Sequence, residues 1–166
     1  KILVFVRTKV RAERVVKAME RVGISSVAIH SGKDQKTRSA ILEAFRSGEN
    51  KILIATDVSA RGIDIPNVDY VLNYDLPDEA ENYVHRVGRT GRGVAKGIAI
   101  SFCSEEEKPL LEAIQEYIGK DIDSFEIEHQ TYLETLEGSR EKETDWKSLM
   151  TEIEAIQEGK KKKKKR

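Results

Sequence analysis

Three arginines and two glycines lie close together near the middle of the chain, in the order Arg86, Gly88, Arg89, Gly91 and Arg92. A buried core has no use for so many guanidinium groups. A phosphate chain does, because each group is permanently charged and presents a planar fork of donors. The two glycines predict a sharp turn at the end of a helix, from which Arg89 and Arg92 can reach one anion together. The alternative, a solvated basic loop, would account for only one or two of these arginines.

Two further segments carry residues suited to phosphate or sugar contacts. Gln35 and Arg38 are three residues apart near the expected start of a helix, so they share a face close to its positive end. Such an exposed pair is also common by chance. In the loop after residue 55, Gly62 permits close backbone approach, Arg61 offers a phosphate contact and Asp64 is an acceptor suited to a ribose hydroxyl.

These segments must be positioned by a regular framework, and apolar strands alternate with amphipathic helices along the chain. The strands are predicted at residues 2–6, 27–29, 52–55, 70–72 and 97–102. Thr8 is expected to cap the first helix, and Asp78 and Glu81 are expected to form a capping box at the start of the helix carrying Arg86. The alternation predicts an α/β fold with three layers, in which a mostly parallel sheet is covered on both faces. Such sheets bind ligands beyond the carboxyl ends of their strands, where the candidate segments fall.

The chain has 166 residues, enough for one domain with a sizeable core and an appendage. We place the domain at residues 1–122 and an acidic extension at 123–159. In the extension, Trp146, Leu149, Met150, Ile153 and Ile156 recur at helical spacing and predict one more amphipathic helix. That helix could pack on the domain, bind a second copy or a partner, or form only a crystal contact.

The formal net charge is zero, but the charges are unevenly distributed. Residues 160–166 hold seven of the 29 basic residues and no acidic ones, so residues 1–159 carry 22 basic and 29 acidic residues, a net charge of −7. We expect this basic tail to be disordered, because like charges repel, and to contact a polyanion such as RNA or an acidic protein.

The single cysteine and the absence of long apolar runs bear on the compartment. Cys103 has no partner for an internal disulfide, and its place in the apolar run 98–103 predicts a small buried thiol. No apolar run approaches the roughly 20 residues that cross a bilayer, and we expect no secretory signal. These features fit a reducing cytoplasm. Because the first strand starts at residue 2, we also expect the chain to be a piece of a longer protein.

Four segments resemble motifs of the superfamily 2 helicases, in the wording of the DEAD-box RNA helicases. Residues 83–92 resemble motif VI, residues 4–8 motif IV, residues 35–38 motif IVa and residues 55–64 motif V. Their order and spacing also fit, so the resemblance covers about residues 1–120. It implies the second, carboxy-terminal RecA-like domain of a helicase core. The wording and the basic extension look bacterial, similar to the RhlE-like branch.

The resemblance implies a nucleotide site shared between two domains. Arg89 and Arg92 would act as arginine fingers, and Gly62 and Asp64 would face the nucleotide. ATP and Mg²⁺ would be bound mainly by an absent amino-terminal domain, since this chain has no P-loop, acidic magnesium box or adenine-reading segment. His85 and Arg86 would couple the nucleotide site to the RNA site. For these two, the alternative is a cation favoured by the helix dipole.

The remaining motif residues are implied to contact the RNA backbone. They are Arg7, Thr8, Gly32, Gln35, Arg38, Thr56, Asp57 and Arg61. Gly32 stands one residue later than in the commonest family wording, which weakens its assignment. Backbone contacts carry no base information, so the binding is expected to be independent of RNA sequence. His30 is expected to be structural, and His129 is left unassigned.

The leading hypothesis is therefore the carboxy-terminal half of an ATP-dependent RNA helicase that unwinds short duplexes locally and is inactive as an isolated domain. One rival is a DNA-directed superfamily 2 helicase or translocase that uses the same arginines. The other is a non-catalytic binding module that serves as a scaffold for a partner.

Overall fold

The computed structural model describes residues 1–60, 65, 68–91, 97–126 and 133. Residues Lys1–Phe125 form one compact unit, and Glu126–Arg166 are a second one. The predicted helix around Trp146, the basic tail and His129 lie outside the described residues. The proposed domain boundary at residue 122 stays a prediction.

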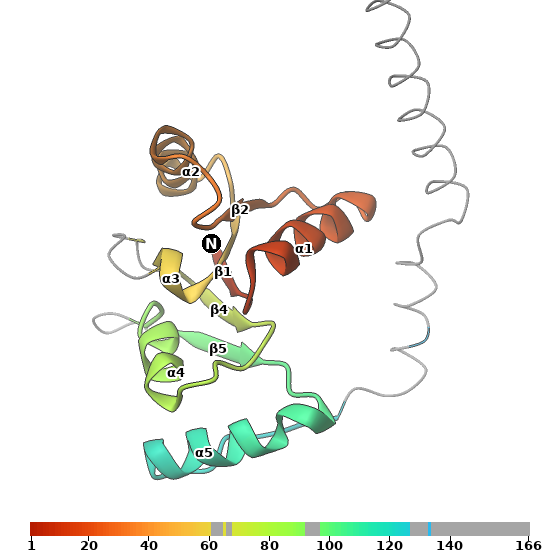
Figure 1. Cartoon of the computed structure of the whole chain (residues 1–166), viewed down its shortest axis with the longest axis vertical. Helices are drawn as coiled ribbons and strands as arrows, with labels where there is room; N and C mark the ends of the chain where they lie inside the picture. The colour runs from red at the N-terminus through yellow and green to blue at the C-terminus, as the bar shows by residue number, and fades with distance from the viewer. Residues whose placement is uncertain (61–64, 66–67, 92–96, 127–132, 134–166) are drawn as a thin grey trace, which may run out of the picture. The chain divides into compact units, whose positions relative to one another are not determined.

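Five parallel strands form a single sheet in the first unit (Figure 1). They are β1 (Ile2–Phe5), β2 (Val27–Ile29), β3 (Ile52–Ala55), β4 (Tyr70–Asn73) and β5 (Ile98–Ser101). Their order is β2-β3-β1-β4-β5, and each neighbouring pair is parallel. The central strand β1 aligns Leu3 with Leu53 on one side and Val71 on the other, and all three side chains are fully buried. The predicted α/β fold with a parallel sheet is confirmed.

The helices divide between the two faces of the sheet. They are α1 (Lys9–Arg21), α2 (Gln35–Ser47), the short α3 (Asp57–Ala60), α4 (Ala80–Val87) and α5 (Lys108–Ile118). Ala12 and Val15 of α1 pack on Val4 and its neighbours on one face. Phe45 of α2 packs against the opposite face, and in Figure 1 α1 lies on the right of the strands with α2, α3 and α4 on the left.

Helix ends follow the local sequence at some positions and not at others. Thr8 caps α1, because its hydroxyl oxygen accepts the Arg11 N–H at 3.1 Å, as predicted. The predicted capping box at Asp78 and Glu81 is wrong. Helix α4 begins after Glu79, which makes no capping hydrogen bond, and the Asp78 carboxylate instead lies 3.4 Å from Arg7 Nε. A nearby cation competes successfully with the helix end for this carboxylate.

Coverage of the sheet also differs from the expectation. On the α1 face, no helix that the structure describes covers the half formed by β4 and β5, and five apolar side chains there are 38 to 50% exposed: Tyr70, Tyr74, Ile98, Ile100 and Phe102. The rings of Tyr74 and Phe102 meet edge to face at 5.9 Å. Helix α5 does not return over this face but packs on α4, where Ile114 meets Tyr83. Only α1 covers this face among the described helices, and it reaches the β1 and β3 half.

Cys103 is exposed, so its predicted burial is wrong. Strand β5 ends at Ser101, and the apolar run continues past it into a turn on the surface. Partial desolvation, with the carboxylate of Glu107 as a second cause, raises the pKa of the Cys103 thiol and so disfavours its reactive thiolate. In the described part of the chain, no helix is long and apolar enough to span a membrane.

Candidate functional site

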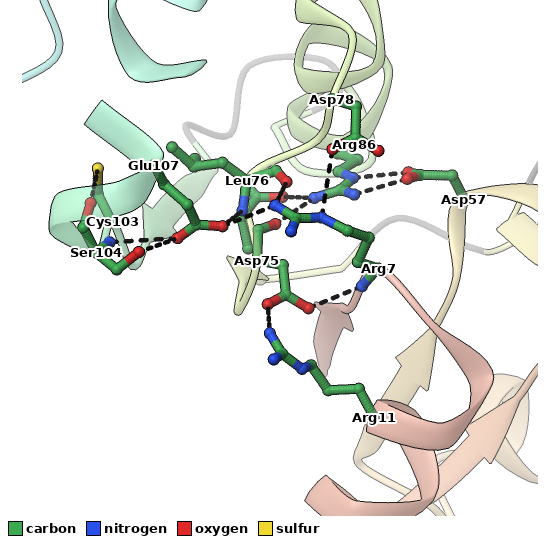
Figure 2. Close-up of polar contacts among 11 residues, drawn as sticks. Arg7, Arg11, Asp57, Asp75, Leu76, Asp78, Arg86, Cys103, Ser104 and Glu107 are labelled. Atoms are coloured by element: carbon green, nitrogen blue, oxygen red, sulfur yellow. Dashed lines mark hydrogen bonds and ion pairs between the residues drawn. The ribbon is translucent and has the colours of Figure 1, made fainter. Parts of the chain in front are cut away.

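Arg86 lies in the interior at the carboxyl edge of the sheet, with only 1% of its surface exposed. Its Nε and Nη2 atoms donate to the two carboxylate oxygens of Asp57, each at 2.7 Å. Its Nη1 atom donates to the Asp75 carbonyl at 2.7 Å and to Asn73 Oδ1 at 3.2 Å. The guanidinium also lies over the Phe5 ring, 5.0 Å from its centre (Figure 2 shows the pairing with Asp57).

This set of contacts joins three parts of the site. Asp57 starts α3 directly after β3, Asp75 follows β4, and Arg86 stands on α4. A buried guanidinium needs such paired acceptors, because its desolvation otherwise costs several kcal/mol. Arg86 is therefore a structural clamp, and it physically links the segment of Thr56 and Asp57 to the arginine helix. Its proposed role in coupling stays a prediction.

Arg89 follows one turn later and has a different environment. It is only partly buried and lines an open pocket with Phe5, Asp57, Asn82 and His85. Its guanidinium makes no hydrogen bond or ion pair with any residue that the structure describes. The pocket lies where β1 ends at Phe5 and just after β3, so Arg89 sits at the carboxyl edge that the topology predicts for a ligand.

The main chain around Arg89 is held firmly. Arg89 N–H donates to the Arg86 carbonyl, and the Arg89 carbonyl accepts the Val68 N–H, both at 3.1 Å. Thr90 Oγ1 lies within hydrogen-bonding distance of the Val68 and Asp69 carbonyls, at 2.8 and 3.1 Å. A fixed main chain that carries a cation without a partner in the described part of the chain suits an anion-binding side chain.

The glycines around this turn differ in their roles. Gly91 adopts a φ of +71°, which favours glycine, as expected for a sharp turn. Gly88 adopts a φ of −63°, so the prediction that both glycines supply conformational freedom is wrong for Gly88. An added Cβ at Gly88 would lie 3.2 Å from the Val84 carbonyl oxygen, a tight contact that a small shift would have to relieve.

The predicted motif IV residues are engaged within the domain. Arg7 Nη2 donates to the Leu76 carbonyl at 3.2 Å and to Glu107 at 3.0 Å, as drawn in Figure 2. The Thr8 hydroxyl is the α1 cap. An RNA phosphate at Arg7 would therefore have to compete with Glu107 and with Asp78.

Gly32 and His30 form a local structure. The Gly32 N–H donates to His30 Nδ1 at 3.1 Å, which leaves the His30 proton on Nε2, 2.8 Å from Glu13 Oε1. An added Cβ at Gly32 would meet the His30 ring at 3.0 Å. His30 is thus structural, as predicted, and the Gly32 N–H already has an acceptor.

Gln35 and Arg38 share one face of the first turn of α2, and Arg38 Nη1 lies 3.4 Å from Gln35 Oε1. Asp34 caps this helix by accepting the Thr37 N–H at 2.9 Å, and this hydrogen bond lowers the pKa of Asp34. Thr56, by contrast, is buried, and its hydroxyl donates to Ser59 at 3.1 Å. Gln35 is exposed and Arg38 is half-buried beside it, whereas Thr56 and Asp57 have internal partners.

Four predicted site residues lie outside the described part of the chain: Arg61, Gly62, Asp64 and Arg92. Conversely, sequence reasoning did not single out Asp75, Arg11 or Glu107. Asp75 had a usable signal, because it follows a parallel strand in the way that Thr56 and Asp57 follow β3. The pairing of Glu107 with Arg7 spans 100 positions and has no local signature.

Residues 1–94 match the family model described as the helicase conserved C-terminal domain. The chain belongs to this family. It is 48% identical over 110 residues to the ATP-dependent RNA helicase DBP2 of Saccharomyces cerevisiae, a match that covers 66% of this chain and 20% of that protein. This helicase domain thus spans about a fifth of the length of that curated relative. The RhlE-like assignment stays a prediction.

Solved structures agree with the family. The Escherichia coli DEAD-box protein SrmB, solved with the regulator of ribonuclease activity A, superposes with a TM-score of 0.72 at 35% identity, covering 76% of this chain and 75% of that one. Dbp5 of S. cerevisiae, solved with RNA and ADP BeF3, gives a TM-score of 0.69 at 35% identity, covering 84% and 38%. The predicted resemblance to the C-terminal RecA-like domain of the DEAD-box helicases is confirmed.

Proposed function

We propose that this chain is the carboxy-terminal half of an ATP-dependent RNA helicase, and that Arg89 is one of its arginine fingers. The observation that carries the proposal is the contrast within one helix end. Arg86 is buried and fully engaged, whereas Arg89 has a fixed main chain and a guanidinium at the carboxyl edge of the sheet that contacts no charged or hydrogen-bonding partner among the described residues. Arg92 is proposed to act beside it.

The nucleotide site is shared with an amino-terminal domain. That domain would hold most of the ATP contacts and a Mg²⁺ ion, which would supply positive charge at the phosphates. Arg89 enters the site when the two domains close, and its positive charge then stabilises the negative charge of the transition state. Arginine fingers contribute about 10³- to 10⁵-fold to the rate of phosphoryl transfer. Gly62 and Asp64 are proposed to contact the same nucleotide.

The RNA backbone binds along the same edge of the sheet. Gln35 and Arg38, at the positive end of α2, hold one phosphate, and Arg7 holds another after exchanging Glu107 for it. Thr8, Gly32, Thr56, Asp57 and Arg61 complete the proposed contacts. These groups read phosphate and sugar, so the helicase binds RNA without sequence preference.

The clamp of Arg86 connects the two ligands. Asp57 lies in the segment proposed to contact RNA, and Arg86 fixes it to α4, which carries His85 and ends at Val87, two residues before Arg89. A movement of either ligand site is therefore transmitted to the other. We further propose a cytoplasmic location and an accessory contact of the basic tail with RNA.

The test uses the full-length protein, with its amino-terminal domain. We expect ATP hydrolysis that RNA stimulates and DNA does not, and a fall of at least about 10³-fold in Arg92→Ala. The isolated chain is expected to show no ATPase activity and weak, salt-sensitive RNA binding. Equal stimulation by DNA would favour the DNA-directed rival. An unchanged ATPase rate in Arg92→Ala would favour the binding module.

A further inference from the structure

Asp75 is a buried carboxylate at the point where three elements of the site meet. Only 2% of the residue is exposed, and it lies two positions after the end of β4 at Asn73. Its Oδ2 atom accepts the Arg7 N–H at 2.8 Å, and its Oδ1 atom is bound by Arg11 Nη1. Its carbonyl accepts from Arg86 Nη1 at 2.7 Å. Figure 2 shows Arg7 and Arg11 converging on this one side chain.

Arg11 is the cation that balances the buried charge of Asp75. Its side chain is half exposed, yet it reaches inward from the first turn of α1 to Asp75. The main-chain N–H of Arg11 also donates to the Thr8 cap. The pair therefore fixes both the exit of the chain from β1 at Arg7 and the start of α1 at Thr8.

A continuous series of polar contacts follows from these bonds. It runs from Thr8 through Arg11 to the Asp75 carboxylate, and from the Asp75 carbonyl to Arg86. Arg86 in turn holds Asp57 and stands one turn before Arg89. The carboxylate of Asp75 is thus bonded to the segment of the proposed RNA contacts, and its carbonyl is bonded to the helix that precedes the proposed nucleotide contact.

We propose that Asp75 and Arg11 are positioning residues that couple RNA binding at Arg7 and Thr8 to the arginine helix α4. The inference rests on the proposed function, and neither residue touches a ligand in it. When the contact between Arg11 and Asp75 is broken, the start of α1 is no longer held in position relative to α4. The RNA-binding groups at Arg7 and Thr8 are then less well positioned, and RNA binds more weakly. A coupling between sites typically changes an affinity by about 5- to 150-fold.

The experiment measures RNA-stimulated ATP hydrolysis of the full-length protein at saturating ATP. In Arg11→Gln, we expect the RNA concentration for half-maximal stimulation to rise about 5-fold or more, with kcat at saturating RNA within about twofold of wild type. Arg14→Gln is the matched control, because Arg14 is exposed on the same helix and has no described partner. It removes the same charge, and its half-maximal RNA concentration is expected to stay within about twofold of wild type.

Two further variants separate positioning from mere stability. Arg11→Lys keeps a cation for the single contact with Asp75 and is expected to restore most of the RNA affinity. Asp75→Asn is expected to raise the half-maximal RNA concentration, and the double variant with Arg11→Gln is expected to be no worse than the worse single one, since both remove the same contact. If Asp75→Asn fails to fold, Arg11→Gln and Arg11→Lys still decide the matter.

The outcomes also distinguish the inference from the function beneath it. If wild type responds to RNA but Arg11→Gln matches Arg14→Gln, the coupling role is overturned and the helicase function stands. A loss of kcat with an unchanged half-maximal RNA concentration, or additive single effects, overturns it as well. If wild-type ATP hydrolysis does not respond to RNA at all, the proposed function itself is wrong.

Discussion

Arg86 lies in the last turn of α4 and Arg89 lies three positions later, and their surroundings are opposite. Arg86 is enclosed, with four hydrogen bonds to Asp57, Asn73 and Asp75. The guanidinium of Arg89 has no partner among the described residues and faces a pocket. One arginine, Arg86, thus stabilises the fold, whereas the other, Arg89, presents its charge at the pocket.

Helix geometry explains this difference. Tyr83 and Arg86 are three residues apart on α4, so both point to the buried side. The helix ends at Val87, and the turn that follows carries Arg89 away from that side. Thr90 then fastens the turn to the Val68 carbonyl. The main chain that carries Arg89 is therefore held in place by the clamp of Arg86 and by Thr90, while the Arg89 guanidinium has no partner among the described residues.

The largest effect is expected from Arg89→Ala in the full-length protein. ATP hydrolysis should fall by at least about 10³-fold, because the transition state loses a positive charge. The free energy of unfolding of the present chain should change by less than about 0.5 kcal/mol, since no described contact is lost. Steady-state kinetics and urea unfolding measure the two quantities. An unchanged kcat for ATP hydrolysis would show that Arg89 is not part of the proposed nucleotide site.

Arg86→Met, unlike Arg89→Ala, should lower the free energy of unfolding by a large amount. It fills much of the same volume but leaves the Asp57 carboxylate without its cation, and breaking such a pair costs about 3 kcal/mol or more. Urea unfolding of this chain measures the loss, with Arg89→Ala as the matched control. Equal stability of the two variants would mean that Arg86 and Arg89 do not differ as the structure indicates.

This distinction could not have been predicted from the sequence, although the framework around it could. The runs at residues 2–6 and 52–55 are apolar and rich in β-branched residues, so strands buried on both faces were predictable. Burial of Arg86 depends on Asp57, which lies 29 positions earlier and looks like an ordinary strand-end turn. Periodicity could have placed Arg86 on the buried side with Tyr83, but it does not identify a partner.

The incorrect predictions have the same physical origin. Local spacing predicts a helix cap at Asp78, but its carboxylate lies 3.4 Å from Nε of Arg7, which follows β1 far away in the sequence. The apolar neighbours of Cys103 predict a place in the core, but β5 ends two residues before it and Cys103 is exposed. Local patterns predict helices and strands well. The partner of a charged side chain and the burial of an apolar one depend on residues that are distant in the sequence.

Asp57→Asn should have an intermediate effect, because it retains one acceptor for Arg86 but removes the charge. We expect a loss of about 2 kcal/mol in the free energy of unfolding, within the range for hydrogen bonds to charged groups. Combined with Arg86→Met, the loss should be clearly less than the sum of the two single losses, since the same pair is broken. Additive losses would show that Arg86 is stabilised mainly by Asn73 and Asp75 instead.

The smallest effect is expected at Glu13, in an ion cluster that is half exposed and remote from the clamp. Hydrogen bonds from Lys33, and then from His30, lower the pKa of Glu13 below its ordinary value of 4.5. A carboxylate whose pKa is depressed in the folded state stabilises the fold above its unfolded pKa, and this stabilisation is lost as the pH falls through the folded value.

Glu13→Gln should therefore be less stable than wild type at neutral pH, by less than about 1 kcal/mol because the side chain is well solvated. The difference should shrink as the pH falls below 4.5, the ordinary value. Urea unfolding at several pH values measures it, with Glu20→Gln on the same helix as a control, since Glu20 is exposed. A stability difference that is independent of pH would show that the packing of Glu13 matters and its charge does not. A loss as large as that of Arg86→Met would show that burial of an ion pair does not decide how much it contributes to stability.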